Sequence, residues 1–459
     1  MSAQPVIILA NRGAISTNLN VIHVTAFTGN RQSLLGWPAV NVFDERLGAP
    51  SSPRSLGWYW LRLIAQDLTS PGRAALAVMV VFVLLATSGW TAMRHQKATE
   101  DPSTTAVSAW LHGSIAGHRL PNPDAGTAAI SHFFSSLSNA QRQHLADRYP
   151  LVVGNLNGAP IRLRYEANRI ALGQAEKKAK KDSRSSDLTA DGQQLSLQLA
   201  NRYSELSAPR RQILSFDPRG RGLVAEVFGD LLTARRTAVV VPGVDTDILT
   251  YEKSDKPYSA PEGMAEDLYN SERAADPEAK IAVIAWADYT TPQGLGLDAS
   301  TGELAEVGAV RLNDMVRALP EQTRVQLFCH SYGSVLCGVG ASRLPQWKVT
   351  DITVAGSPGM RAPTVAALRT HARVWAARDE TDWIQNVPYV EVGGLGHGTD
   401  PVSPSFGARV ISAAKAQDHT GYFADGTESL QNFTRIALGE YQSVRCATDS
   451  PDCTAGAMA

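Results

Sequence analysis

Short apolar runs alternate with helical patterns through the second half of the chain, and this alternation restricts the fold more than any other feature. The runs are TAVVV (237–241), KIAVIAW (280–286), RVQLF (324–328), VTDITVAG (349–356) and ARVWAA (372–377). Helical patterns lie between them, for example over 302–318 and 332–343. Continuously apolar strands that alternate with helices are typical of a parallel sheet covered on both faces. We therefore expect an α/β fold whose site lies beyond the carboxyl ends of the strands.

One long uncharged segment lies much earlier in the chain. Ala74 to Met93 contains no charged side chain over twenty positions, which is enough for a helix to cross ~30 Å of hydrocarbon. The arginines at 54, 62 and 73 precede the segment, whereas Arg94 and Lys97 follow it, a slight bias toward an internal amino terminus. We expect a single-pass membrane protein whose remaining chain is extracytoplasmic. The alternative is a buried core helix in a cytosolic protein.

Five regions follow from these patterns. We expect a weakly structured tail (1–73), a transmembrane helix (74–93), a linker and helical region (94–208), an α/β domain (209–441) and a flexible carboxyl-terminal tail (442–459). The α/β domain opens with RQILSFD and GLVAEVFG, which alternate like paired antiparallel strands around the turn PRGR. A later apolar run, ARVISAA, predicts one more strand near its end.

Composition excludes several classes of function. The formal net charge of -1 gives no basic excess for nucleic acid. The 4 cysteines and 10 histidines show no CxxC or paired Cys/His spacing, so we expect no metal site and no cofactor. In an oxidising compartment Cys446 and Cys453 would close a small disulfide loop; two unpaired cysteines in a frayed tail are the alternative. The oligomeric state does not follow from the sequence.

One serine stands where a strand gives way to a helix. Ser331 lies in LFCHSYGSVLCG, after the apolar run that ends at Phe328 and before a helical pattern that begins near Tyr332. The G-x-S-x-G motif of α/β-hydrolases occupies such a turn, which exposes the serine oxygen. Here Cys329 replaces the first glycine, and a small apolar residue is expected to keep the turn. A buried serine in a Gly/Ser-rich bend is the alternative.

An exposed serine nucleophile needs an oxyanion hole, a base and an acid. Backbone N–H groups of Tyr332 and of Val244 or Asp245, in the loop VVVPGVDTD, are the expected oxyanion donors. The acid and then the histidine follow the serine in this fold. We expect Asp382 to be the acid and His419 the base.

Two other residues are alternatives for these roles. Asp379, in the charged cluster RDETD, is an alternative acid. His397, in the glycine-rich loop GLGHGTDP, is an alternative base, and a hydrogen bond that stabilises its loop is its more conservative interpretation.

Several stretches together resemble a bacterial α/β-hydrolase family of the serine-hydrolase type, long catalogued as a domain of unknown function. They run from roughly 130 to 440 and include VVVPGVDTD, CHSYGS, GSPGM, VWAARDETDWI, LGHGTDPVSP and HTGYF. The resemblance implies that Ser331 is the nucleophile, Asp382 the acid and His419 the late histidine. It implies no particular substrate.

These observations lead to two functional hypotheses. The first is a membrane-anchored serine hydrolase of the esterase or lipase type, which cleaves a small-molecule or lipid ester through an acyl-enzyme. The second is a catalytically silent protein of the same fold that serves as a binding or structural module of the cell envelope. Retention of serine, aspartate and histidine in the expected order favours the first.

Overall fold

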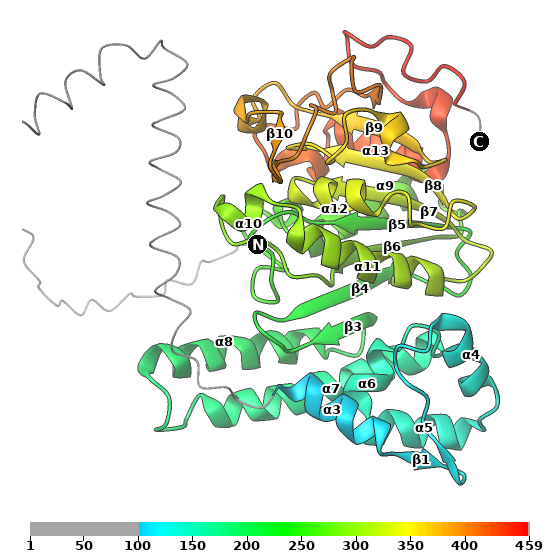
Figure 1. The fold of residues 1–459 in the computed structure, drawn as a ribbon, viewed down its shortest axis with the longest axis vertical. Helices are drawn as coiled ribbons and strands as arrows, with labels where there is room; N and C mark the ends of the chain where they lie inside the picture. Colours follow the sequence, from blue (N-terminus) through cyan, green and yellow to red (C-terminus); the bar gives the residue numbers. More distant parts are fainter. Residues whose placement is uncertain (1–100, 458–459) are drawn as a thin grey trace, which may run out of the picture. The chain divides into compact units, whose positions relative to one another are not determined.

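The computed structural model describes residues 101–457, and an eight-stranded sheet forms its centre (Figure 1). The strand order is β12-β9-β8-β7-β5-β6-β4-β3. Five neighbouring strand pairs are parallel, and β4 pairs antiparallel with both β3 and β6. The predicted mostly parallel α/β fold is therefore confirmed. The strands are β3 (Ile213–Asp217), β4 (Leu223–Gly229), β5 (Arg236–Val241), β6 (Ile281–Ala287), β7 (Arg324–His330), β8 (Val349–Ala355), β9 (Arg373–Ala377) and β12 (Arg409–Val410).

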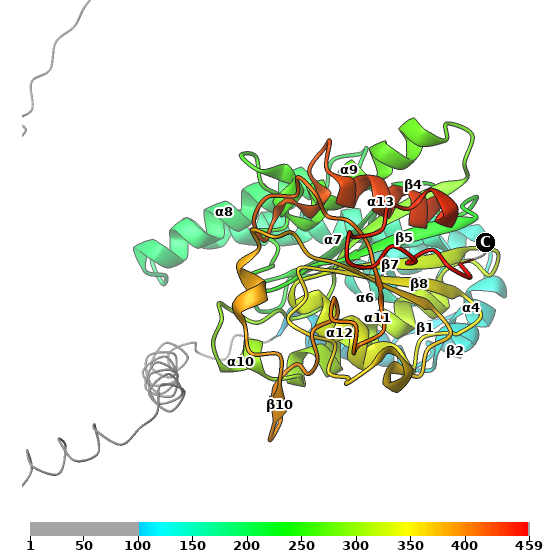
Figure 2. The same cartoon turned by 90° about the horizontal axis from the view of Figure 1, so that it is seen from above.

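Helices cover both faces of this sheet (Figures 1 and 2). Val239 and Val241 of β5 pack into one apolar cluster with α11 (Glu303–Ala318) and α12 (Tyr332–Gly340). Ala238 and Val240 belong to a second cluster with α9 (Pro261–Ala275) and α13 (Glu428–Leu438). Successive side chains of a strand point to opposite faces, so a strand buried on both faces must be apolar throughout.

A helical region precedes the sheet and has an apolar core of its own, centred on Trp110, Ile130, Phe134 and Leu145. Ser138 and Gln141 form a reciprocal hydrogen-bonded capping pair at the amino terminus of α5, so α5 begins as a helix separate from α4. The helices of this region are α3 (Pro102–Leu111), α4 (Thr127–Ser135), α5 (Asn139–Arg148), α6 (Pro150–Asn155), α7 (Ile161–Asp182) and α8 (Ala190–Leu206).

Polar side chains of the helical region bind the backbone of β3, the last strand in the sheet order. Asn155 accepts a hydrogen bond from the Phe216 N–H (3.1 Å) and donates one to the Phe216 carbonyl (2.7 Å). The Arg164 Nη2 donates to the Leu214 carbonyl (2.9 Å), and Asn168 Nδ2 donates to the Ile213 carbonyl (2.9 Å). An edge strand leaves a row of backbone groups without sheet partners. The helical region supplies partners for four such groups of β3.

Replacing Arg164 by alanine is expected to destabilise the protein by about 2–4 kcal/mol. Arg164 is buried and also donates to the Gly154 carbonyl, so its loss leaves buried carbonyl oxygens without partners. Urea unfolding of the full chain measures the change. The exposed Arg162 on the same helix is the matched control, and Arg162→Ala should change the free energy of unfolding by less than about 0.5 kcal/mol. Equal losses for both variants would contradict this account of the interface.

No helix within 101–457 is long and apolar enough to span a membrane. The predicted transmembrane helix (74–93) and amino-terminal tail (1–73) lie outside the described residues.

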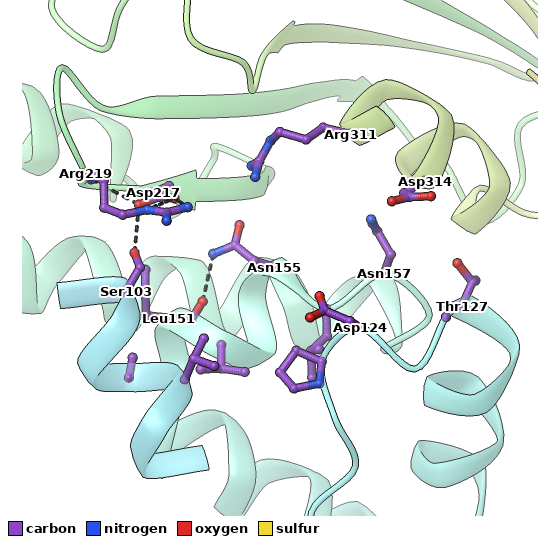
Figure 3. Close-up of a pocket in the computed structure, with 16 residues that line it drawn as sticks. Ser103, Asp124, Thr127, Leu151, Asn155, Asn157, Asp217, Arg219, Arg311 and Asp314 are labelled. Atoms are coloured by element: carbon purple, nitrogen blue, oxygen red, sulfur yellow. Dashed lines mark hydrogen bonds and ion pairs between the residues drawn. The ribbon is translucent and has the colours of Figure 1, made fainter. Parts of the chain in front are cut away.

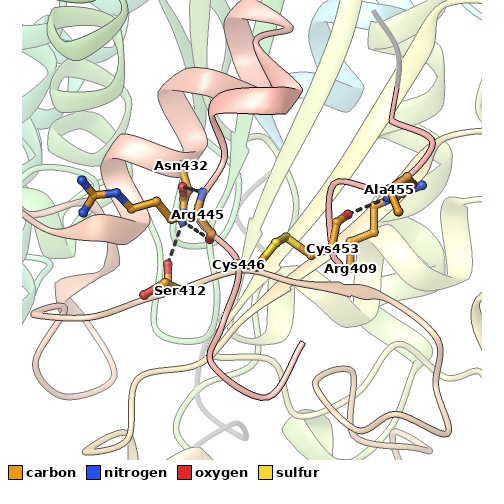
Figure 4. Close-up of a disulfide and its surroundings, with 7 residues drawn as sticks. All are labelled: Arg409, Ser412, Asn432, Arg445, Cys446, Cys453 and Ala455. Carbon is orange, nitrogen blue, oxygen red and sulfur yellow. Dashed lines mark hydrogen bonds between the residues drawn. A yellow bond between two sulfur atoms is a disulfide. The ribbon is translucent and has the colours of Figure 1, made fainter. Parts of the chain in front are cut away.

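The carboxyl-terminal segment packs against the end of the sheet, where the sequence predicts a flexible tail (Figure 4). Cys446 and Cys453 form a disulfide. Ile411 and Cys446 form an antiparallel bridge, and Arg409 donates hydrogen bonds to the Cys453 and Ala455 carbonyls (2.6 and 2.8 Å). The segment therefore continues the sheet next to β12, where it covers an edge that the short strand would leave open.

Candidate active site

The turn between β7 and α12 presents Ser331. This residue has φ 53° and ψ -127°, a backbone conformation that non-glycine residues rarely adopt and that is typical of strained functional turns. Its N–H donates to the Ala355 carbonyl (3.0 Å) of the neighbouring strand β8, which holds the turn in place. A Cβ on Gly333 would lie 2.3 Å from the Val241 carbonyl oxygen. Only glycine allows helix and strand to approach so closely behind the serine.

The structure brings Ser331, His419 and Asp382 together in one hydrogen-bonded row. The His419 Nε2 lies 2.8 Å from the Ser331 Oγ. The His419 Nδ1 lies 2.9 and 3.0 Å from the two carboxylate oxygens of Asp382. Asp382 follows β9 and His419 follows β12, so both reach the serine from the carboxyl ends of strands of the same sheet. This row has the geometry of a nucleophile, its base and the acid that orients the base.

Asp382 is completely buried and hydrogen-bonded on both carboxylate oxygens. Tyr422 donates its hydroxyl to Oδ2 (2.6 Å), and the Ile384 N–H donates to Oδ1 (2.8 Å) at the start of η3 (Trp383–Asn386). Burial alone would raise the pKa of Asp382, but the hydrogen bonds from His419, Tyr422 and Ile384 hold that pKa below its usual value. The carboxylate is therefore ionised at neutral pH and fixes the tautomer and direction of the imidazole.

The His419 ring packs against two other rings, and 12% of its side chain is exposed. Trp383 lies 4.7 Å away and His330 lies 5.0 Å away, both between ring centroids. The His330 Nε2 is 2.7 Å from the His419 carbonyl oxygen, so His330 also holds the loop that carries the base.

Two backbone N–H groups next to the serine are available as oxyanion donors. A Cβ on Gly243 would lie 2.6 Å from the Ser331 Cβ, which shows how closely the loop after β5 approaches the serine. Within the described part of the chain, the N–H groups of Val244 and Tyr332 donate to no other protein group. Asp245 is a correction: its N–H already donates to the Pro292 carbonyl (2.9 Å), so it cannot bind an oxyanion.

The alternative acid and base have other roles. The His397 Nε2 lies 2.7 Å from the Ala299 carbonyl oxygen, and the ring packs edge-on against Tyr332 at 5.7 Å. Asp379 accepts hydrogen bonds from the N–H (2.9 Å) and hydroxyl (2.6 Å) of Thr381, and it is buried rather than solvated. Both residues shape loops around the row, and neither hydrogen-bonds to Ser331 or His419.

A disulfide between Cys329 and Cys337 spans the serine turn. Cys329 is in β7, two residues before Ser331, and Cys337 is in α12. From the sequence, Cys329 is predicted only as a small apolar residue in the turn, so this bond is not predicted. The available signal was the separation of 8 residues across a predicted strand, turn and helix. The bond ties strand to helix directly behind the nucleophile.

His330 makes stability depend on pH. Burial, followed by the nearby His419, lowers the pKa of His330 to about 3. Between about pH 6.5, where an unfolded histidine titrates, and pH 3 the unfolded chain binds a proton that the native protein lacks. The free energy of unfolding must therefore fall as the pH falls through this range. The contribution of this one group amounts to about 2 kcal/mol at pH 5.

We expect His330→Gln to remove this part of the pH dependence, because glutamine keeps a hydrogen-bond donor but does not titrate. Urea unfolding of both proteins at pH 7 and pH 5 measures it. The wild type should lose about 2 kcal/mol more than the variant between these pH values. Equal losses would show that folding does not lower the pKa of His330.

A polar pocket of about 360 Å³ lies between the helical region and the sheet (Figure 3). Asp217 accepts a hydrogen bond from Ser103 (2.8 Å) and pairs with Arg219, and Arg311 pairs with Asp288 (2.5 Å). Both guanidinium groups already have carboxylate partners, and no member of the Ser331 row lines the pocket. It is part of the contact between the two regions, and we assign it no chemistry.

The chain is similar in sequence to one family and to several other proteins. Residues 217–392 match the family described as alpha/beta hydrolase. Two uncharacterized proteins of Mycobacterium tuberculosis, from strains CDC 1551 / Oshkosh and H37Rv, are 27% identical to the chain over 379 residues. Each alignment covers 70% of this chain and 57% of the relative, so the chain spans little more than half of these relatives.

Solved structures are similar over part of the chain. An a/b serine hydrolase without lid from Xanthomonas campestris is 14% identical with a TM-score of 0.31, covering 50% of this chain and 95% of its own. Est1E from Butyrivibrio proteoclasticus is 12% identical with a TM-score of 0.30, covering 50% and 95%.

Proposed function

We propose that the protein is a membrane-anchored serine hydrolase that cleaves carboxylic esters, on the premise that residues 217–392 match the alpha/beta hydrolase family. The observation that carries the proposal is the row of Ser331, His419 and Asp382, with 2.8 Å between serine and imidazole and 2.9 Å between imidazole and carboxylate. A binding module would have no need of a buried, ionised carboxylate aligned in this way.

The proposed reaction has two halves. The His419 Nε2 accepts the Ser331 proton while the Ser331 oxygen attacks the ester carbonyl, and the Asp382 carboxylate stabilises the resulting imidazolium. The N–H groups of Tyr332 and Val244 stabilise the negative charge on the carbonyl oxygen. His419 then protonates the departing alcohol, which leaves an acyl group on Ser331. Water, deprotonated by His419, hydrolyses this acyl-enzyme and regenerates the serine.

The location proposed for this reaction is the extracytoplasmic side of a membrane. The uncharged segment Ala74–Met93 supplies the anchor in this proposal. All four cysteines of the chain are paired in two disulfides, Cys329 with Cys337 and Cys446 with Cys453. Disulfides persist in oxidising compartments and are rare in the cytosol, so this pairing supports the extracytoplasmic side.

Hydrolysis of p-nitrophenyl esters of graded chain length tests the proposal. We expect the full chain to release p-nitrophenol, with an initial burst that approaches one equivalent per protein wherever deacylation is slower than acylation. The length of the best substrate then gives the acyl preference. Absence of hydrolysis with every ester would contradict an esterase and favour a silent hydrolase fold that serves as a binding or structural module.

A further inference from the structure

Large apolar side chains are exposed on the loops that surround the candidate active site. Val392 is 72% exposed and Trp383 is 41% exposed, and Trp383 packs directly against His419. We call this set the apolar rim. Its members are Leu295, Leu297, Trp383, Val390, Val392 and Leu395. Single exposed apolar residues are normal on a protein surface, but a group of them beside one site indicates a contact surface.

Hydrogen bonds join the two main loops of the apolar rim to each other and to the nucleophile turn. His397, next to β11 (Leu395–Gly396), bonds the Ala299 carbonyl in α10 (Leu297–Ser300) at 2.7 Å. The Tyr332 hydroxyl donates to the Thr301 carbonyl (2.9 Å). α10 and the hairpin of β10 (Glu391–Val392) and β11 lie on the same side of the sheet in both views (Figures 1 and 2). The apolar rim is therefore one surface beside Ser331.

The start of α3 lies at the carboxyl ends of the parallel strands, which is also where Ser331 lies. β3 pairs antiparallel with β4 and β4 with β6, so β3 runs in the direction of the parallel strands. Its last residue, Asp217, lies at the edge where Ser331 lies, and it accepts a hydrogen bond from Ser103 at the start of α3 (2.8 Å). Only eight residues, 94–101, separate α3 from the uncharged segment. They reach at most about 27 Å, so a membrane anchor would keep this edge near the bilayer.

We propose that the apolar rim contacts the surface of the bilayer and that the substrates are ester lipids taken from that bilayer. The proposal rests on the proposed function, because it names the substrate class of the same site. The Trp383 indole suits the interface between headgroups and acyl chains, and the leucine and valine side chains suit the layer beneath it. An acyl ester that leaves the bilayer at the rim meets His419 and Ser331 without crossing water.

The first test compares two substrates of the full chain in lipid vesicles. p-Nitrophenyl palmitate is placed in the bilayer, and p-nitrophenyl acetate is supplied from water. Val392→Ser/Leu395→Ser, which changes a cross-strand pair of the hairpin without adding charge, should lower palmitate hydrolysis at least tenfold and leave acetate hydrolysis within twofold. The control is Leu232→Ser/Trp347→Ser. These two exposed apolar residues precede β5 and β8, at the amino ends of the strands, and their replacement should change neither rate. Unchanged palmitate hydrolysis, or equal loss with both substrates, would overturn the proposal.

The second test needs no catalysis. Vesicles with brominated acyl chains should quench the emission of Trp383, so Trp383→Phe should show less quenching than the wild type. Trp347→Phe, at the amino ends of the strands, should keep the wild-type quenching. Quenching of Trp383 without ester hydrolysis would contradict the proposed function and keep the lipid contact. No difference between the two variants would overturn the lipid contact, and a changed oligomeric state of rim variants would assign the rim to protein association.

Discussion

Ser331→Ala is expected to lower kcat/KM for ester hydrolysis on the order of 10⁵-fold. The Ser331 Oγ is the only atom of the assembled row placed to attack a carbonyl, and it lies 2.8 Å from the imidazole nitrogen that accepts its proton. Loss of a nucleophile that works as a unit with its base removes nearly all of the rate enhancement and leaves what binding and the oxyanion donors supply. Steady-state kinetics on a soluble p-nitrophenyl ester measure the change.

Ser215 provides the matched control for this variant. It is a buried serine in β3, and its hydroxyl has no hydrogen-bond partner in the described part of the chain. Ser215→Ala should therefore leave kcat/KM within about threefold of the wild type. A Ser331→Ala protein that folds and retains more than a tenth of the wild-type rate would show that another group attacks the ester.

His419→Ala is expected to lower kcat by a similar factor, on the order of 10⁵, and His397→Ala by less than about tenfold. The reason is geometric: the His419 Nε2 lies within hydrogen-bonding distance of Ser331, whereas the His397 Nε2 binds the Ala299 carbonyl. Loss of His397 instead leaves that carbonyl without its partner and should cost about 1–2 kcal/mol of stability.

Kinetics and urea unfolding of the two histidine variants separate these effects. The account predicts low activity with near-normal stability for His419→Ala, and near-normal activity with lower stability for His397→Ala. The reverse pattern would show that His397, in the glycine-rich loop, is the catalytic base.

The sequence predicts the central strands well because each of them is buried on both faces. β5, β6, β7, β8 and β9 read as continuous apolar runs, and helices cover both sides of all of them. The outermost strand β12 is predicted less well. The run ARVISAA forms only the two-residue strand Arg409–Val410, and beyond it an isolated bridge joins Ile411 to Cys446. Which segment covers an edge depends on contacts between parts of the chain far apart in sequence, and no local pattern shows these.

The same distinction applies to the candidate site. Chain order and strand ends predict that Ser331, Asp382 and His419 approach one another, since parallel strands end at one edge of the sheet. They do not show that the Asp245 N–H donates a hydrogen bond to the Pro292 carbonyl, or that Cys329 and Cys337 form a disulfide. Nor do they show the apolar rim, because the exposure of Val392 and Leu395 results from a hairpin that projects away from the rest of the domain.

Labelling with a fluorophosphonate probe tests the central claim most directly, because such probes phosphonylate a serine only when a base has activated it. We expect the native full chain to form one adduct, located by peptide mass mapping on Ser331. Ser331→Ala should form none, and His419→Ala should react far more slowly than the wild type. A native protein that forms no adduct, or forms it on another serine, would contradict the claim that Ser331, His419 and Asp382 work together as a catalytic triad.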